Sequence, residues 1–312
     1  MTDPLPRAPS RRALLQALAL TATATGSPLS AREPQLSFVA LGDWGRRGAA
    51  RQRAVAGAMA AAAEAAGSRF VISVGDNFYE NGVQSVTDTQ WKTSFEDVYT
   101  APSLQTPWYA VLGNHDHRGS AQAQVDYTRA SARWRMPDRY YRISGAHHGA
   151  PQLDLFFLDT TALVEGYGQA SPQALQRAAT AQLDWLDAEL GRSRAAWKLV
   201  VGHHTVHSGG SQHGDTPALL AKVKPLLETH GVQAYLNGHD HDLQHIRRGP
   251  VDYIGTGAGS AVRAVRLIEG TRFCLARAGF ALFSLGAETL TLEFRDFTGA
   301  SVYRTALPRL RA

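Results

Sequence analysis

Short apolar runs recur along this chain and are separated by longer stretches with a different pattern. The runs are rich in β-branched or aromatic residues, and most of them end in a Gly or Asp turn. Runs of this length bounded by turn residues are typical of buried strands. We therefore predict strands at residues 36–41, 70–74, 108–112, 153–158, 197–201 and 234–236.

Three of the intervening stretches have the composition of helices. Residues 49–66 are rich in Ala, which has the highest helix propensity. Residues 172–190 follow Ser171, a suitable N-cap, and residues 217–230 follow Thr216 in the same way. Alternation of strands with helices predicts an α/β fold.

The last third of the chain has a different pattern. Residues 281–285, 290–294 and 301–305 are strand-like and are joined by short turns without a helix between them. We predict hairpins here that add to a second sheet, so that two packed sheets are flanked by helices. No linker rich in Pro, Gly or Ser interrupts the chain after residue 36, which predicts one domain over residues 32–312.

Five short motifs contain residue types that bind metals, and each motif follows a predicted strand. They are Gly42-Asp43-Trp44-Gly45, Gly75-Asp76-Asn77-Phe78-Tyr79, Gly113-Asn114-His115-Asp116, Val201-Gly202-His203-His204 and Gly238-His239-Asp240-His241. In open α/β sheets, sites form beyond the carboxyl ends of the strands. The motifs are therefore expected to meet, and together they supply enough ligands for two metal ions.

The residue types fit hydrolysis of a phosphate ester at two metal ions, which lie roughly 3.5–4 Å apart in such sites. A bridging carboxylate offsets part of the repulsion between the ions, and imidazole suits zinc or iron. Tyr79 is the sharpest indication. A phenol has a pKa of about 10, and a bound cation promotes loss of its proton. Ferric iron, a hard and highly charged ion, would do this best.

The five motifs resemble those of the calcineurin-like metallophosphoesterases, and Tyr79 is similar to the tyrosine of the purple acid phosphatase branch, in particular its small tartrate-resistant type. The resemblance covers residues 36–308 and includes Trp134-Arg135-Met136-Pro137 and Gly238-His239-Asp240-His241-Asp242-Leu243-Gln244. It implies a four-layer α/β/β/α sandwich of two mixed β-sheets flanked by helices, with a binuclear metal site at the C-terminal ends of the strands.

The resemblance also implies a role for each ligand. The first metal, expected to be Fe(III), is bound by Asp43, Tyr79 and His241. The second metal, expected to be Fe(II), Zn(II) or Mn(II), is bound by Asn114, His203 and His239. Asp76 is expected to bridge the two ions.

Two further histidines are implied to act on the substrate. His115 matches a histidine that contacts the phosphate, and His213 matches one that helps to protonate the leaving group. The segment between His203 and His213 is one residue longer than the family pattern, so His207 is the alternative to His213. We also hypothesise that Asp116 orients His115 through a hydrogen bond.

The main functional expectation is an acid phosphatase that cleaves small phosphate monoesters by attack of a metal-bound hydroxide. A phosphodiesterase or nucleotidase with the same ligands is an alternative, because the walls of the pocket and not the ligands separate these activities. A non-hydrolytic iron protein, acting in redox chemistry or binding, is a third interpretation.

The N-terminus predicts an export signal over residues 1–31. Ser10-Arg11-Arg12-Ala13-Leu14-Leu15 resembles a twin-arginine motif, an apolar stretch follows it, and Ala22-Thr23-Ala24 suits cleavage. The apolar stretch is shorter than the ~20 residues that a transmembrane helix needs, so no stable membrane insertion is expected. An unstructured basic tail is the alternative. Export would take the protein to the periplasm or beyond.

Composition narrows the picture only slightly. The formal net charge of +5 suits anionic substrates in general, and without a nucleic-acid-binding motif it does not indicate nucleic acid. The densest basic cluster, Arg46, Arg47, Arg51 and Arg53, is interpreted as the solvated start of a helix. The lone Cys274 excludes an intramolecular disulfide. Nothing in the sequence indicates an oligomeric state.

Overall fold

The computed structural model describes residues 36–164 and 171–309, all of which lie in a compact unit that runs from Pro34 to Ala312. The strands are β1 (Leu36–Leu41), β2 (Val71–Ser73), β3 (Trp108–Ala110), β4 (Trp134–Arg135), β5 (Tyr141–Ser144), β6 (Leu153–Phe157), β7 (Trp197–Val201), β8 (Ala234–Asn237), β9 (Leu243–Arg248), β10 (Val251–Thr256), β11 (Thr271–Leu275), β12 (Gly279–Leu285), β13 (Thr289–Asp296) and β14 (Ser301–Pro308). The helices are α1 (Ala50–Ala65), α2 (Ala121–Asp126), α3 (Thr160–Val164), α4 (Pro172–Arg192), α5 (Pro217–Lys222) and α6 (Lys224–Thr229).

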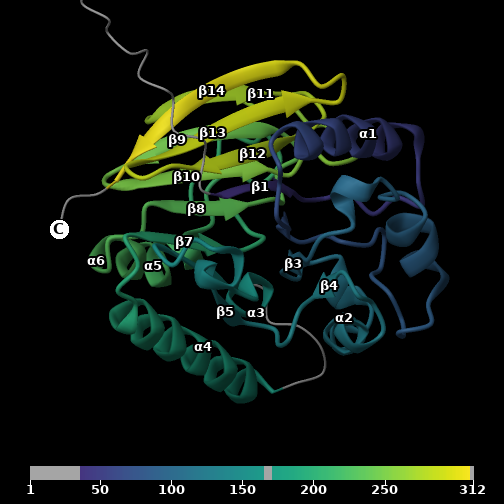
Figure 1. The fold of residues 1–312 in the computed structure, drawn as a ribbon. Coiled ribbons are helices and arrows are strands. Elements are labelled where there is room, and N and C mark those ends of the chain that lie inside the picture. The colour runs from purple at the N-terminus through teal and green to yellow at the C-terminus, as the bar shows by residue number, and fades with distance from the viewer. Residues whose placement is uncertain (1–35, 165–170, 310–312) are drawn as a thin grey trace, which may run out of the picture. The chain divides into compact units, whose positions relative to one another are not determined.

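Two mixed sheets form the centre of this unit (Figure 1). The first sheet has the order β14-β13-β12-β1-β2-β3-β4, and the second has the order β11-β9-β10-β8-β7-β6-β5. Parallel pairs join β1, β2 and β3 in the first sheet and β6, β7 and β8 in the second. The prediction of two mixed sheets flanked by helices is confirmed, and all six predicted strands of the α/β part are present.

The C-terminal hairpins lie in a different sheet from the one predicted. Strands β12, β13 and β14 extend the first sheet, because β12 pairs antiparallel with β1 from Leu36↔Leu285 to Ala40↔Ala281. The second sheet is instead extended by β9, β10 and β11. Which edge a hairpin joins depends on long-range pairing, and the apolar alternation of the hairpin is the same in either case.

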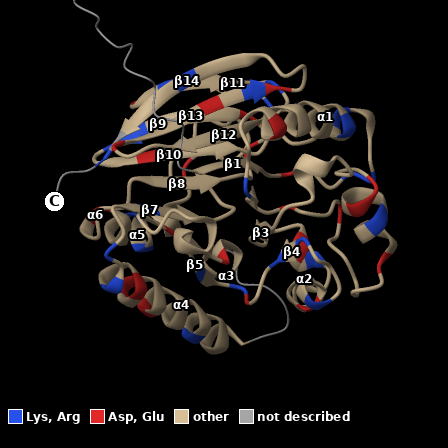
Figure 2. Ribbon diagram, in the orientation of Figure 1, with Lys and Arg blue, Asp and Glu red and all other residues tan. Residues whose placement is uncertain are grey.

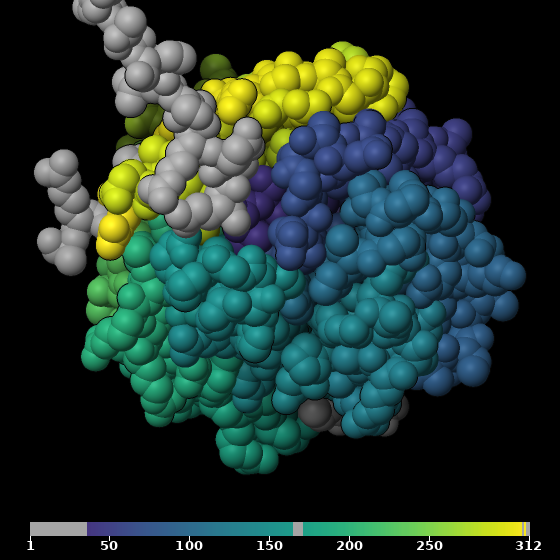
Figure 3. Space-filling model, in the orientation of Figure 1, coloured from purple at the N-terminus to yellow at the C-terminus, as the bar shows by residue number. Residues whose placement is uncertain are grey.

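Alternating side chains on β6 show how the layers pack. Leu155 and Phe157 belong to the larger core that also contains α1 and the first sheet, whereas Phe156 belongs to a second core beneath α4, α5 and α6. Successive side chains of a strand point to opposite faces, so the second sheet is buried on both. Figure 3 shows α1 directly beside the C-terminal strands, and Figure 2 shows charged residues on the helices, on loops and on the C-terminal strands.

The start of α4 is as predicted, whereas the helix predicted at 217–230 is interrupted. Ser171 caps α4 by accepting a hydrogen bond from the Ala174 N–H, as predicted. The expected helix at 217–230 is divided at Val223 into α5 and α6. Pro225 explains the division, because a proline in a helix interior cannot donate its backbone hydrogen bond and clashes with the preceding turn.

The described part of the chain contains no helix that is long and apolar enough to cross a membrane. The predicted export signal over residues 1–31 lies outside the described residues.

Candidate metal centre

Five strand ends bring the metal-binding motifs together at the junction of the two sheets. Strands β1, β2 and β3 of the first sheet lead into the motifs of Asp43, Asp76 and Asn114, while β7 and β8 of the second sheet lead into those of His203 and His239. Among the described residues, ligand atoms of Asp43, Asp76 and His203 all lie within 4.8 Å of one another. The carboxyl ends of neighbouring parallel strands thus position the side chains as the sequence predicted.

Tyr79 lies at the centre of one half of the site. Its hydroxyl oxygen is 2.8 Å from Asp43 Oδ1, 2.9 Å from Asp76 Oδ2 and 3.0 Å from His241 Nε2. His241 Nε2 is in turn 3.2 Å from Asp43 Oδ1. A phenol has one proton to donate, so these closely spaced acceptors need more positive charge than Tyr79 supplies.

His203 lies at the centre of the other half. Its Nδ1 is 2.9 Å from the Val74 carbonyl oxygen, which directs Nε2 into the site. That Nε2 is 3.2 Å from Asn114 Oδ1, 3.3 Å from His239 Nδ1 and 3.5 Å from Asp76 Oδ1. A metal-bound histidine commonly makes a hydrogen bond through its other ring nitrogen, and this bond orients the ring. Asp76 therefore presents one oxygen to each half, as a bridging ligand requires.

The pKa shifts at the site also indicate that bound cations would stabilise it. Burial lowers the pKa of His203, but the charges of Asp76 and Asp43 outweigh burial and raise it overall. Burial, followed by the same two carboxylates, raises the pKa of Tyr79 well above its usual value. Burial and neighbouring His203 lower the pKa of His239, which favours the neutral imidazole that binds metals. The donor set thus fits two metal ions, which would replace the missing protons.

His115 and His213 both lie beside the predicted ligands. His115 Nδ1 is 2.6 Å from the Glu80 carbonyl oxygen, and its Nε2 is 3.9 Å from Asp76 Oδ2. The exposed His213 ring lies on the His239 ring, with their centroids 3.9 Å apart. Burial and the nearby Arg263 lower the pKa of His213, although Asp240 opposes this.

His207, the alternative to His213, lies in a different environment. It is 6% exposed, its Nδ1 is 3.0 Å from Asp215 Oδ2, and its ring packs edge-on against Tyr253. These contacts bury His207 against the second sheet, whereas the His213 ring lies beside the predicted ligand His239.

The backbone at three predicted ligands is left-handed. The φ angles are 58° at Asp43, 49° at Asp76 and 71° at His239. Side chains other than glycine adopt this region rarely, and functional sites are where the surrounding structure enforces it. At Gly113, a Cβ would overlap Asp76 Oδ1, so a glycine is needed for the two motif loops to approach each other.

Asp116 has a different role from the one hypothesised. Its buried carboxyl makes no hydrogen bond to His115 among the described residues. It accepts hydrogen bonds from the backbone N–H groups of Gly113, Asn77 and Phe78, and from Gln124 Nε2 at 2.8 Å. Burial and the charge of Asp76 raise the pKa of Asp116 to about 6. Asp116 therefore ties the loops after β2 and β3 together.

Several contacts at the site could not be predicted from the five motifs. Thr160 Oγ1 accepts hydrogen bonds from the backbone N–H groups of His203 at 3.1 Å and His204 at 3.0 Å. The Arg46 guanidinium, predicted to be solvated, lies 3.8 Å above the centre of the Tyr79 ring. Arg263 Nη1 is 3.1 Å from His213 Nε2. The adjacency of Arg46 to the first motif was the only sequence clue to these contacts.

Comparison with known proteins agrees with this geometry. Residues 36–243 match the calcineurin-like phosphoesterase family. The chain is 36% identical to tartrate-resistant acid phosphatase type 5 of Homo sapiens, in an alignment that spans 95% of this chain and 96% of that protein. It is 42% identical to purple acid phosphatase 17 of Arabidopsis thaliana, over 72% of this chain and 68% of that protein.

A solved structure supports the fold separately. GAP50, the anchor in the inner membrane complex of Plasmodium, superposes with a TM-score of 0.79 over 89% of this chain and 90% of that one, at 24% sequence identity. At this identity the likeness concerns the fold alone. The family match and the two more similar relatives carry the assignment: this chain belongs to the purple acid phosphatases, within the calcineurin-like phosphoesterase family.

Proposed function

We propose that this protein is a binuclear-metal acid phosphatase that hydrolyses phosphate monoesters. The observation that carries the proposal is the convergence of seven ligand side chains from five strand ends, with acceptor atoms facing one another and too few protons between them. The acid phosphatase names of its relatives support the same activity.

The proposed ligand sets follow the two halves of the site. Fe(III) would be held by Asp43, Tyr79 and His241. Fe(II), Zn(II) or Mn(II) would be held by Asn114, His203 and His239. Asp76 would contribute one oxygen to each ion. Two such ions, when bound, polarise a phosphate and lower the pKa of a bound water to about 7.

The chain's own residues would bind and orient the phosphate. The Glu80 carbonyl oxygen accepts the Nδ1–H of His115 and leaves Nε2 facing the site, where the doubly protonated, cationic ring would donate to a phosphate oxygen. The exposed His213 ring, held on His239, is placed to give a proton to the departing alkoxide.

We also propose that residues 1–31 direct export by a twin-arginine route and that residues 32–312 are the catalytic domain. Support comes from the paired arginines Arg11 and Arg12 ahead of an apolar stretch. Replacing both with Lys should keep the protein in the cytoplasm of an expressing bacterium. Equal periplasmic yield from the variant and the parent would contradict this proposal.

The first test is a visible spectrum of the metal-replete protein, with metal content measured on the same sample. A broad charge-transfer band that disappears in Tyr79→Phe is expected for Fe(III) bound by the tyrosine. A colourless protein that holds two zinc or manganese ions would retain the phosphatase proposal and change the metals. A protein that binds no metal after reconstitution would overturn both.

Rates on three phosphate compounds test the reaction class. A simple aryl monophosphate should be hydrolysed much faster than the corresponding bis-aryl diester or a nucleoside monophosphate. The opposite order would favour a phosphodiesterase or nucleotidase with the same metals. Two bound metals without phosphate release from any of the three would instead favour a non-hydrolytic iron protein.

A further inference from the structure

The guanidinium of Arg46 lies against the ring of Tyr79, the proposed tyrosine ligand of Fe(III). Its Cζ is 3.8 Å from the centre of the ring, which is van der Waals contact. A cation over an aromatic face is attracted by the negative charge of the π system. The attraction is stronger for a phenolate, because the ring and its oxygen then share a full negative charge. Arg46 is therefore placed to act on Tyr79 in the form that binds a metal.

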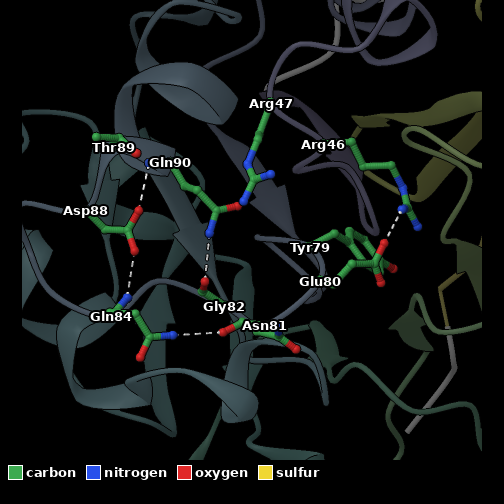
Figure 4. Close-up of a pocket in the computed structure, with 10 residues that line it drawn as sticks. All are labelled: Arg46, Arg47, Tyr79, Glu80, Asn81, Gly82, Gln84, Asp88, Thr89 and Gln90. Atoms are coloured by element: carbon green, nitrogen blue, oxygen red, sulfur yellow. Dashed lines mark hydrogen bonds and ion pairs between the residues drawn. The ribbon is translucent and has the colours of Figure 1, made fainter.

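Several hydrogen bonds hold Arg46 in this position. Its Nε donates to Ser260 Oγ at 3.1 Å, its Nη1 pairs with Glu80 Oε1 at 2.9 Å, and its backbone N–H donates to Gln52 Oε1 at 3.1 Å (Figure 4). The buried Ser260 hydroxyl donates in turn to the carbonyl oxygen of Asp43, a proposed ligand of the same metal. The fold thus sets the position of this charge relative to two of the three Fe(III) ligands.

Glu80 compensates the charge of Arg46 only in part at the Tyr79 ring. The Glu80 side chain is 63% exposed, whereas that of Arg46 is 28% exposed and touches a buried ring. Solvent and salt screen an exposed charge strongly, and they screen a charge in contact with buried atoms much less. The nearest and least screened charge at this face of the ring is therefore the positive one.

We propose that Arg46 weakens the electron donation from Tyr79 to Fe(III), because its charge stabilises negative charge on the phenolate ring. The inference rests on the ferric phosphatase site proposed above. Arg46 acts through Tyr79 and is not a catalytic residue. Groups around a metal ligand adjust the ion's properties through that ligand. A phenolate that donates less leaves the ion a stronger Lewis acid toward phosphate, and it raises both the energy of charge transfer and the reduction potential.

Arg47 provides an internal comparison, because it adjoins Arg46 in the same loop and carries the same charge. Both arginines line a cavity beside Tyr79, but the guanidinium of Arg47 is directed toward Gln90 (Figure 4). Of the two, only Arg46 stacks on the Tyr79 ring in the described structure. Replacing each arginine in turn therefore separates the effect of the contact from the effect of a nearby charge.

The experiment measures the charge-transfer band of the metal-replete protein and the midpoint potential at which the band bleaches on reduction. In Arg46→Gln the phenolate loses its cation and donates more strongly, so the band should move to longer wavelength and the potential should fall. Arg46→Lys keeps the charge without the planar contact and should lie between the parent and Arg46→Gln. Ser260→Ala, which frees the guanidinium, should shift both quantities in the same direction by less. Arg47→Gln is the matched control and should shift them least.

A band and potential in Arg46→Gln that equal those of the parent, or that move no further than in Arg47→Gln, overturn the inference. Arg46→Lys that behaves like Arg46→Gln also overturns it, because the contact is then structural and the charge has no role. Iron content and circular dichroism exclude metal loss and misfolding as causes. If Arg46→Gln retains no iron, Arg46→Lys and Ser260→Ala are compared with the parent instead, and unchanged values in both overturn the inference.

The parent protein separates this inference from the proposed function. A parent that releases phosphate but has no charge-transfer band removes the ferric site and the role of Arg46, and it leaves the phosphatase function in place. A parent that binds metal but releases no phosphate overturns the proposed function. A parent with both the band and activity, and a band that the Arg46 variants do not move, removes only the inference.

Discussion

The two sheets contribute different kinds of donor atom to the proposed metal centre. The loops of the first sheet provide oxygen donors from Asp43, Asp76, Tyr79 and Asn114, whereas those of the second provide ring nitrogens from His203, His239 and His241. Each proposed metal takes ligands from both sheets. The oxygen half concentrates negative charge and the nitrogen half does not, so neither half is a complete site. Metal binding should therefore hold the two sheets together.

Metal removal should give the largest effect on this comparison. Without metal, the oxygen half keeps its uncompensated carboxylates, and we expect complete loss of activity. If each free ion is present at about a thousand times its Kd, the loss of stabilisation is ~4 kcal/mol per ion and ~8 kcal/mol for both, which lowers Tm by roughly 16–32 °C. Calorimetry before and after chelation, with metal re-addition as the control, measures this. An unchanged Tm would mean that the sheets are not coupled through the site.

Asp76→Ala should be the most damaging single substitution, because Asp76 alone presents an oxygen to each of the two proposed metal positions, one beside Tyr79 and one beside His203. Loss of a bridging ligand removes several kcal/mol of transition-state stabilisation, about 10³-fold or more in kcat/KM. Metal analysis should show fewer than two ions per chain. Asp126→Ala, at a partly exposed surface carboxylate, is the control. Normal turnover in Asp76→Ala would disprove the two-metal arrangement.

Replacement of the two candidate acids should separate the exposed histidine from the buried one. His213→Gln should lower kcat by about 10²-fold on an alkyl phosphate, the usual size of general-acid assistance. The effect should be smaller on an aryl phosphate, whose leaving group needs less protonation. His207→Gln, away from the ligands, should alter stability more than the ratio of these two rates. The reverse pattern would assign the acid role to His207.

Replacing the residues that hydrogen-bond to the ligand loops, Asp116 for the first sheet and Thr160 for the second, should give the smallest effects on activity. Asp116→Asn, behind the oxygen half, should lower activity or metal affinity 10- to 100-fold, roughly the range for residues that orient ligands. Thr160→Val, behind the nitrogen half, should cost less, because Thr160 receives two backbone N–H groups and Asp116 receives three together with Gln124. Titration with metal, followed by calorimetry, compares them. A larger loss in Thr160→Val would reverse this ranking of the halves.

The ligand types and strand ends could be predicted because they depend on local patterns. Apolar runs ending in Gly-Asp, Gly-Asn or Gly-His turns located β1, β2, β3, β7 and β8, and the nine proposed site residues lie together beyond them. The helix at 217–230 was predicted without the break at Val223, although Pro225 was a visible cue. The glycine-rich sequence at residues 257–259 gave no indication that the Gly259 N–H donates a hydrogen bond to the Gly42 carbonyl oxygen.

Other features depended on contacts between segments far apart in the chain. The sequence placed Arg46 in solvent, as most arginines are, but the approach of two loops lays its guanidinium on Tyr79. Asp116 follows His115 directly, which suggested a bond between them, yet its carboxyl faces the backbone of the preceding motif loop. Neighbours in sequence point in different directions in a tight turn, so adjacency did not predict the partner.

By itself, the sequence determined which side chains lie just beyond the strand ends that meet at the site, because residue type and strand periodicity are local properties. The tertiary structure decided how those side chains are divided between the two sheets and how Asp76 presents one oxygen toward Tyr79 and the other toward His203. It also decided which arginines lie beside the site. It also fixed the left-handed backbone at Asp43, Asp76 and His239. Those features arise from packing between strands that are remote in the chain, where burial and backbone hydrogen bonds outweigh local preference.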